Sequence, residues 1–136
     1  MKTKAAEIVH RMYDNDPFSK WLGIELLEVG EGISSLRLTV KPEMLNGFDV
    51  LHGGITYSLA DSSLAFASNA HGRKSMSIET SISHTKPCKV GDILTTKTIE
   101  RSLNNKIAIY DISIVNQHNE TVALFKGTVY RSEKEW

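Results

Sequence analysis

Two adjacent glycines, Gly53 and Gly54, begin a stretch that is otherwise apolar and helix-forming. Glycine lowers helix propensity by up to about 1 kcal/mol relative to alanine, so we expect some group to approach the backbone there. The first amides of a helix have no partners within the helix and lie at the positive end of its dipole. These two amides could therefore stabilise the negative charge that develops on the oxygen of a reacting carbonyl group.

Asp61 lies two helical turns further along, as an isolated ionisable group in this apolar stretch. Carboxylates are seldom fully buried without a partner, so Asp61 must pair with another group, line a cavity or face water at an interface. Its functional interpretation is a general base or a nucleophile. The structural alternative is a partner for a buried amide or basic group.

Two polar residues, Asn46 and His52, precede the glycines. Both could hold a carbonyl group or a water molecule at the mouth of the same pocket. Their structural alternatives are simpler: Asn46, beside Gly47, could form only a turn, and His52 could cap the helix or stabilise the loop.

The elements that must position these residues are one long helix and a set of strands. Residues 53–70 are apolar around most of a helical circumference, as in a helix covered by other structure. Residues 3–14 form a short amphipathic helix, and Pro17 and Gly23 then break that pattern. Residues 24–40 indicate a β-hairpin with its turn at Gly30 and Gly32, and residues 41–52 an ordered loop.

The rest of the chain predicts four strands, near 74–86, 92–103, 106–116 and 120–131, the last three forming an antiparallel meander. An antiparallel sheet needs one covered face, and the helix at 53–70 is long and apolar enough to cover it. We therefore predict an α+β fold in which a curved antiparallel sheet wraps around one central helix. All 136 residues are expected to form a single domain.

Composition excludes several classes of function. The 16 basic residues balance the 16 acidic ones, so no overall positive charge attracts the chain to nucleic acid or to a membrane. No apolar run is long enough to span a bilayer, and the N-terminal residues do not resemble a signal peptide. Cys88 is the only cysteine and cannot form an internal disulfide, so a cytoplasmic location is expected.

The remaining histidines do not suggest a metal site. Four of them lack a partner at metal-ligand spacing and are interpreted as structural or surface residues: His10, His71, His84 and His118. No metal is therefore expected.

The run NGFDVLHGGITYSLAD resembles the Asn-x5-His-Gly-Gly-x4-Leu-Ala-Asp signature of hotdog-fold acyl-CoA thioesterases, in the PaaI-type branch of phenylacetate degradation. The stretch IYDISIVNQHNETVALFKG is similar to the closing strands of that branch, and KPCKVGD to its Pro-to-Gly-Asp corner. The resemblance covers about residues 21–131.

The resemblance implies a homodimer, often a dimer of dimers, that hydrolyses a coenzyme A thioester without a metal or bound cofactor. Asp61 would be the catalytic carboxylate, and the Gly53 amide would polarise the thioester carbonyl, with Gly54 beside it. Asn46 would hold the attacking water or the carbonyl, and His52 would support the loop and the substrate.

One position departs from the pattern. Related enzymes can carry a hydroxyl residue one turn after the carboxylate, where this chain has Ala65. Ser62 or Ser63 could supply that hydroxyl. Basic residues near the predicted strand ends could meet coenzyme A phosphates or could simply be solvated: Arg73, Lys74, Lys86 and Lys89.

Gly53 and Asp61 are separated by about 12 Å of helix rise, too far to act on one thioester carbon from the same helix. We therefore expect each active site to combine two chains. The resemblance points to phenylacetyl-CoA or ring-hydroxylated relatives, with aliphatic acyl-CoAs still open. A hydratase or dehydratase using His52 and Asp61, and a non-catalytic acyl-CoA-binding module, are the alternative functions.

Overall fold

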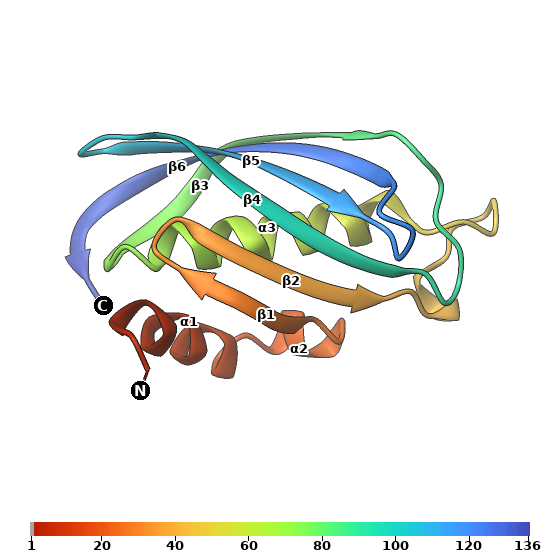
Figure 1. Cartoon of the computed structure of the whole chain (residues 1–136), viewed down its shortest axis with the longest axis horizontal. Coiled ribbons are helices and arrows are strands. Elements are labelled where there is room, and N and C mark those ends of the chain that lie inside the picture. Colours follow the sequence, from red (N-terminus) through yellow and green to blue (C-terminus); the bar gives the residue numbers. More distant parts are fainter. Residues whose placement is uncertain (1) are drawn as a thin grey trace.

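The computed structural model describes residues 2–136, in which a curved six-stranded antiparallel sheet wraps around a long helix, α3 (Gly53–Asn69) (Figure 1). The strand order in the sheet is β1-β2-β4-β5-β6-β3. The strands are β1 (Glu25–Gly30), β2 (Ile33–Thr39), β3 (Arg73–His84), β4 (Ile93–Leu103), β5 (Ile107–Val115) and β6 (Thr121–Glu135). The predicted α+β fold is confirmed.

Two helices precede the sheet. The first, α1 (Lys4–Asp14), is the predicted amphipathic helix, and Thr3 caps it by accepting a hydrogen bond from the amide of Ala6. The second, α2 (Pro17–Trp21), differs from the sequence prediction, in which Pro17 only breaks the first helix. Proline is tolerated at the first position of a helix, and Asp16 caps this one.

The predicted hairpin and meander are both present. Strands β1 and β2 join through Gly32, whose φ of 71° is in the left-handed region that glycine adopts easily. Strands β4, β5 and β6 pair consecutively, and the side chain of Asn104 accepts hydrogen bonds from the turn amides of Lys106 and Ile107. These connections leave β1 and β3 as the two edges of the sheet.

The core lies between α3 and the inner face of the sheet. Leu59 and Leu64 of α3 are almost fully buried, as are Leu38, Leu94 and Ile112 of the strands. Each buried side chain of this size stabilises the fold by about 1.5–3 kcal/mol relative to its exposed state. The helix therefore has little freedom to move within the sheet.

The edge strand β3 keeps two apolar side chains in contact with solvent. Met76 is 63% exposed and Ile78 is 59% exposed. An edge strand with exposed apolar residues is a surface on which a second chain can pair. Within residues 2–136, no helix is both long enough and apolar enough to cross a membrane.

Candidate active site

The first turn of α3 is capped by His52. Nδ1 of His52 accepts a hydrogen bond from the Gly54 amide at 2.9 Å, so this nitrogen carries no proton. A Cβ atom added at Gly54 would lie 3.1 Å from the same nitrogen. Within one chain, His52 therefore acts as the cap of α3, as its structural alternative predicted. Its hydrogen bond occupies the Gly54 amide, which is then not free to bind a substrate.

Gly53 is different, because its amide has no hydrogen-bond acceptor among residues 2–136. A Cβ atom at Gly53 would lie 3.0 Å from Cε1 of His84. The group that approaches the Gly53 backbone within one chain is therefore the imidazole of His84, at the end of β3. The sequence indicated only a structural or surface role for His84, because nothing in its spacing shows that β3 ends beside the first turn of α3.

Asn46 lies in the loop before α3 and forms a turn. Its side-chain Oδ1 accepts a hydrogen bond from the Phe48 backbone amide at 2.8 Å. The backbone amide of Asn46 donates to the Val50 carbonyl at 2.8 Å. The side-chain oxygen of Asn46 therefore stabilises a turn, as the structural alternative predicted. Nδ2 has no acceptor in the described part of the chain, so this side-chain donor is available to a carbonyl oxygen.

Asn46 and Gly53 line one cavity of about 350 Å³, together with Val50, Thr56, His84 and Cys88. Burial raises the pKa of the Cys88 thiol to about 11. At neutral pH this side chain is therefore a neutral wall of the cavity and a poor nucleophile.

A second cavity, of about 360 Å³, continues the first past Pro87 and Cys88, which line both. Lys89 lines this second part, whereas Lys86 is paired with Glu120 at 2.7 Å. Of the four basic residues considered for coenzyme A binding, Lys86 lines both cavities and Lys89 lines only the second. Arg73 hydrogen-bonds Asn105 and Lys74 lies 5.0 Å from the Trp136 ring, both at the opposite end of β3.

Asp61 lines a separate small cavity of about 70 Å³, beside Leu64, Ala65, Ser68, Met76 and Ser77. Partial burial raises the pKa of the Asp61 carboxyl above its usual range. No hydrogen bond or ion pair to this carboxylate exists within the described residues. One chain therefore supplies no structural partner for Asp61 and does not bring it together with Gly53.

Neither serine next to Asp61 reaches this cavity. The Ser62 hydroxyl lies 2.9 Å from the Ser19 hydroxyl, and the Ser63 hydroxyl lies 3.0 Å from that of Thr96. Both are buried on other faces of α3. The hydroxyl groups beside Asp61 belong to Ser68 of α3 and to Ser75 and Ser77 of β3, which the sequence did not indicate.

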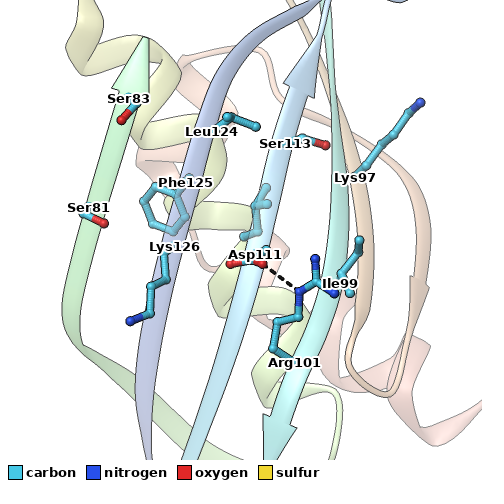
Figure 2. A pocket seen from close by; sticks show the side chains of 11 residues that line it. Ser81, Ser83, Lys97, Ile99, Arg101, Asp111, Ser113, Leu124, Phe125 and Lys126 are labelled. Carbon is cyan, nitrogen blue, oxygen red and sulfur yellow. Dashed lines mark hydrogen bonds and ion pairs between the residues drawn. The ribbon is translucent and has the colours of Figure 1, made fainter. Parts of the chain in front are cut away.

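The outer face of the sheet has a further hollow of about 430 Å³, on the side away from α3 (Figure 2). It crosses β4, β5, β6 and β3, and Arg101 donates a hydrogen bond to Asp111 on its floor at 2.7 Å. None of the residues predicted to act in catalysis lines this hollow. No group of three or more His, Cys, Asp or Glu side chains within residues 2–136 is placed to hold a metal ion.

Comparisons with known proteins identify the family of this chain. The family model described as "Thioesterase superfamily" matches residues 48–123. The acyl-coenzyme A thioesterase PaaI of Escherichia coli is 40% identical over 131 residues, which cover 96% of this chain and 94% of that protein. A putative esterase of Archaeoglobus fulgidus is 40% identical over 137 residues, covering 98% and 89% of the two chains.

The solved structure of the E. coli PaaI protein from the phenylacetic acid degradation operon superposes with a TM-score of 0.95 at 39% identity, covering 97% of this chain and 96% of that one. The region matched by the family model includes His52, Gly53 and Asp61 and begins two residues after Asn46. The chain therefore belongs to the thioesterase superfamily, as a hotdog-fold protein of the PaaI type.

Proposed function

We propose that this protein hydrolyses acyl-CoA thioesters, with Asp61 as the reacting carboxylate and Gly53 and Asn46 as the groups that bind the carbonyl oxygen. The observation that carries the proposal is the pair of free donors in one cavity, the Gly53 amide and Nδ2 of Asn46. Two donors that converge on one oxygen stabilise the negative charge of a tetrahedral intermediate. The 40% identity to an acyl-CoA thioesterase supports the same reaction.

In the proposed reaction, the thioester carbonyl oxygen accepts hydrogen bonds from these two donors. Asp61 takes a proton from a water molecule that attacks the carbonyl carbon, or attacks that carbon itself to form an anhydride that water then opens. The carbon–sulfur bond breaks, and coenzyme A leaves as a thiolate. The products of either route are the free acid and coenzyme A. The proposal includes no metal or bound cofactor.

The proposed active unit is a homodimer. Gly53 and Asp61 line separate cavities of one chain, so a single thioester carbon cannot lie beside both. Two α3 helices packed antiparallel about a twofold axis would place Asp61 of one protomer opposite Gly53 of its partner. The exposed edge strand β3, whose Met76 and Ser77 line the cavity of Asp61, supports this arrangement. A dimer of such dimers, a homotetramer, is the larger assembly implied.

The proposed substrates are phenylacetyl-CoA and its ring-hydroxylated relatives. The likeness to a PaaI protein from a phenylacetic acid degradation operon supports this choice. Lys89, in the groove beyond Pro87, is positioned to meet a coenzyme A phosphate. The cytoplasm is the proposed location, because the one cysteine cannot form an internal disulfide.

The test is the release of free thiol from a panel of aryl and aliphatic acyl-CoAs, followed with a thiol-specific chromogenic reagent. We expect turnover with at least one thioester and the highest kcat/KM with an arylacetyl-CoA. Binding of these thioesters without thiol release would instead support an acyl-CoA-binding module. Hydration of an enoyl-CoA without thiol release would support a hydratase.

A further inference from the structure

The last residue of β3, His84, lies against the first turn of α3. Its backbone pairs with Ala123 of β6, while its imidazole occupies the side of Gly53 where a side chain would otherwise lie. The ring and the Gly53 backbone line the same cavity as Asn46. His84 is therefore next to the proposed carbonyl-binding group, although the mechanism above does not use it.

A short chain of hydrogen bonds joins His84 to Gly53. Oγ1 of Thr56 lies 2.7 Å from Nε2 of His84 and 3.0 Å from the Gly53 carbonyl oxygen. The carbonyl can only accept, so the single hydroxyl proton is donated to it. The hydroxyl oxygen must then accept from the ring, which means that Nε2 of His84 carries a proton.

The peptide unit between Gly53 and Gly54 is consequently held at both ends. Thr56 donates to its carbonyl oxygen, and its N–H group, which belongs to Gly54, donates to Nδ1 of His52 at 2.9 Å. Glycine has the most freedom of any residue in its backbone angles, so an unrestrained Gly53 would let the direction of its own N–H vary. Two imidazoles, one bonded directly and one acting through Thr56, fix the peptide unit that follows Gly53. This limits how the preceding unit, which carries the Gly53 N–H, can rotate about the Gly53 Cα.

We propose that His84 is a positioning residue, which holds the Gly53 amide in the orientation that binds the thioester carbonyl by donating Nε2–H to Thr56. This inference rests on the proposed function for its catalytic consequence. Its structural part, the direction of the hydrogen bonds, does not depend on any reaction. The two parts can therefore be tested separately.

The kinetic test compares two substitutions of His84. Phe keeps a ring beside Gly53 but has no donor, whereas Gln has an amide donor of similar reach. We expect His84→Phe to lower kcat about tenfold, less than the loss of an oxyanion donor itself, with KM within about twofold of wild type. His84→Gln should recover most of this loss. Ser83→Ala, on the outer face of the same strand, is the matched control and should keep wild-type kcat.

A second variant covers the case in which His84→Phe does not fold. Thr56→Val removes the middle of the hydrogen-bond chain and should lower kcat by a similar factor. The double variant should be no worse than either single variant, because both remove the same restraint. Wild-type kcat in His84→Phe or Thr56→Val, a loss in His84→Gln as large as in His84→Phe, or a lower Tm with unchanged kcat would each overturn the proposal.

The structural test uses nuclear magnetic resonance of the wild-type protein and the same variants. The ¹⁵N shifts of His84 should identify Nε2 as protonated in the neutral ring. The Gly53 and Gly54 amide resonances should move in His84→Phe and return toward wild type in His84→Gln. A neutral ring protonated on Nδ1, or glycine resonances that do not respond, would refute the positioning role. If the wild type releases no thiol from any acyl-CoA, the proposed function fails while this test can still succeed.

Discussion

Nδ1 of His52 accepts a hydrogen bond from the Gly54 amide at 2.9 Å, so the two glycines of the signature differ in whether their amides are free to bind a ligand. Gly54 has its donor occupied within the chain, whereas the donor of Gly53 is free among residues 2–136. The carbonyl-binding role predicted for the pair therefore falls on Gly53. Each glycine also leaves room for an imidazole, His84 beside Gly53 and His52 beside Gly54.

Replacing Gly53 with a larger residue should stop catalysis without unfolding the chain. A Cβ at this position would lie 3.0 Å from Cε1 of His84, an exposed side chain that can shift without opening the core by giving up its hydrogen bond to Thr56. The new side chain would also obstruct the carbonyl's approach to the amide, and losing such a donor typically costs about 10²–10³ in kcat. We expect Gly53→Val to lower kcat by at least about 100-fold with a circular dichroism spectrum like that of wild type.

Gly30→Val is the matched control, because a Cβ there would make only ordinary contacts of 3.7 Å or more with Ile33. It should keep wild-type kcat. A fully active Gly53→Val protein would rule out the carbonyl-binding role of this amide.

Asp61→Asn should remove turnover while preserving the fold. The amide is nearly the same size as the carboxylate, but it is neither a base nor a good nucleophile. Loss of a positioned base or nucleophile typically lowers kcat by about 10²–10⁴. Steady-state kinetics with the best acyl-CoA substrate measures the effect, and a kcat close to that of wild type would exclude Asp61 from catalysis.

The same substitution should stabilise the protein at neutral pH. Burial raises the pKa of Asp61 above its value in an unfolded chain. Between these two pKa values the folded state binds more protons than the unfolded state, so stability falls as pH rises through that interval. Asn carries no charge, so we expect Asp61→Asn to have the higher Tm at pH 7 and the difference to shrink as pH falls below the raised pKa.

Thermal unfolding of both proteins across pH 4–8, in matched buffers, tests this expectation. A wild-type protein that gains stability on ionisation of Asp61 would contradict it. In a dimer, that result would mean that a partner subunit supplies a group that pairs with the carboxylate.

Most of the fold could be predicted from the sequence, because the spacing of apolar residues indicates helices and strands and the turn residues indicate where they end. The all-round apolar pattern of 53–70 indicated a covered helix, and the alternation after Ser34 indicated a strand. The position of His84 beside Gly53 could not be predicted in the same way. His84 is 28 positions from Thr56 and meets it only because β3 runs back along α3. Neither the hydrophobic period nor the residue spacing shows where β3 ends relative to α3.

The serines beside Asp61 illustrate the same limit. Ser62 and Ser63 were proposed because they follow Asp61 directly, but neighbours in a helix point in directions about 100° apart. The structure turns both toward other elements and places Ser77 of β3 beside Asp61. Roles inferred from chain proximity are thus the weakest part of a prediction from sequence alone.

Replacing Gly127 of β6 should lower the stability of the protein by overpacking its core. A Cβ there would lie 2.5 Å from Cδ2 of Leu64, and Leu64 is almost fully buried and cannot move away. Overpacking of a core typically costs about 1–3 kcal/mol. We expect Gly127→Ala to lower the free energy of unfolding by about that amount in urea denaturation. Unchanged stability would show that α3 can shift away from β6.

The proposed dimer makes the most specific prediction. Asn46 and Gly53 share a cavity in one chain, whereas Asp61 lies in another. If each active site combines the first pair from one protomer with Asp61 of its partner, Asn46→Ala and Asp61→Asn disable different halves of the same site. A mixed dimer then has one site with both defects and one site with neither.

Two inactive proteins should therefore regain activity when they are mixed under conditions that exchange subunits. With equal amounts and random exchange, about half of the dimers are mixed and each has one intact site of two, so activity should approach about a quarter of the wild-type value. Exchange itself is verified by mass spectrometry of differently labelled chains, and two Asp61→Asn preparations mixed in the same way serve as the control. If exchange is complete and the mixture stays as inactive as its parents, Asn46 and Asp61 act within one chain and the shared site is refuted.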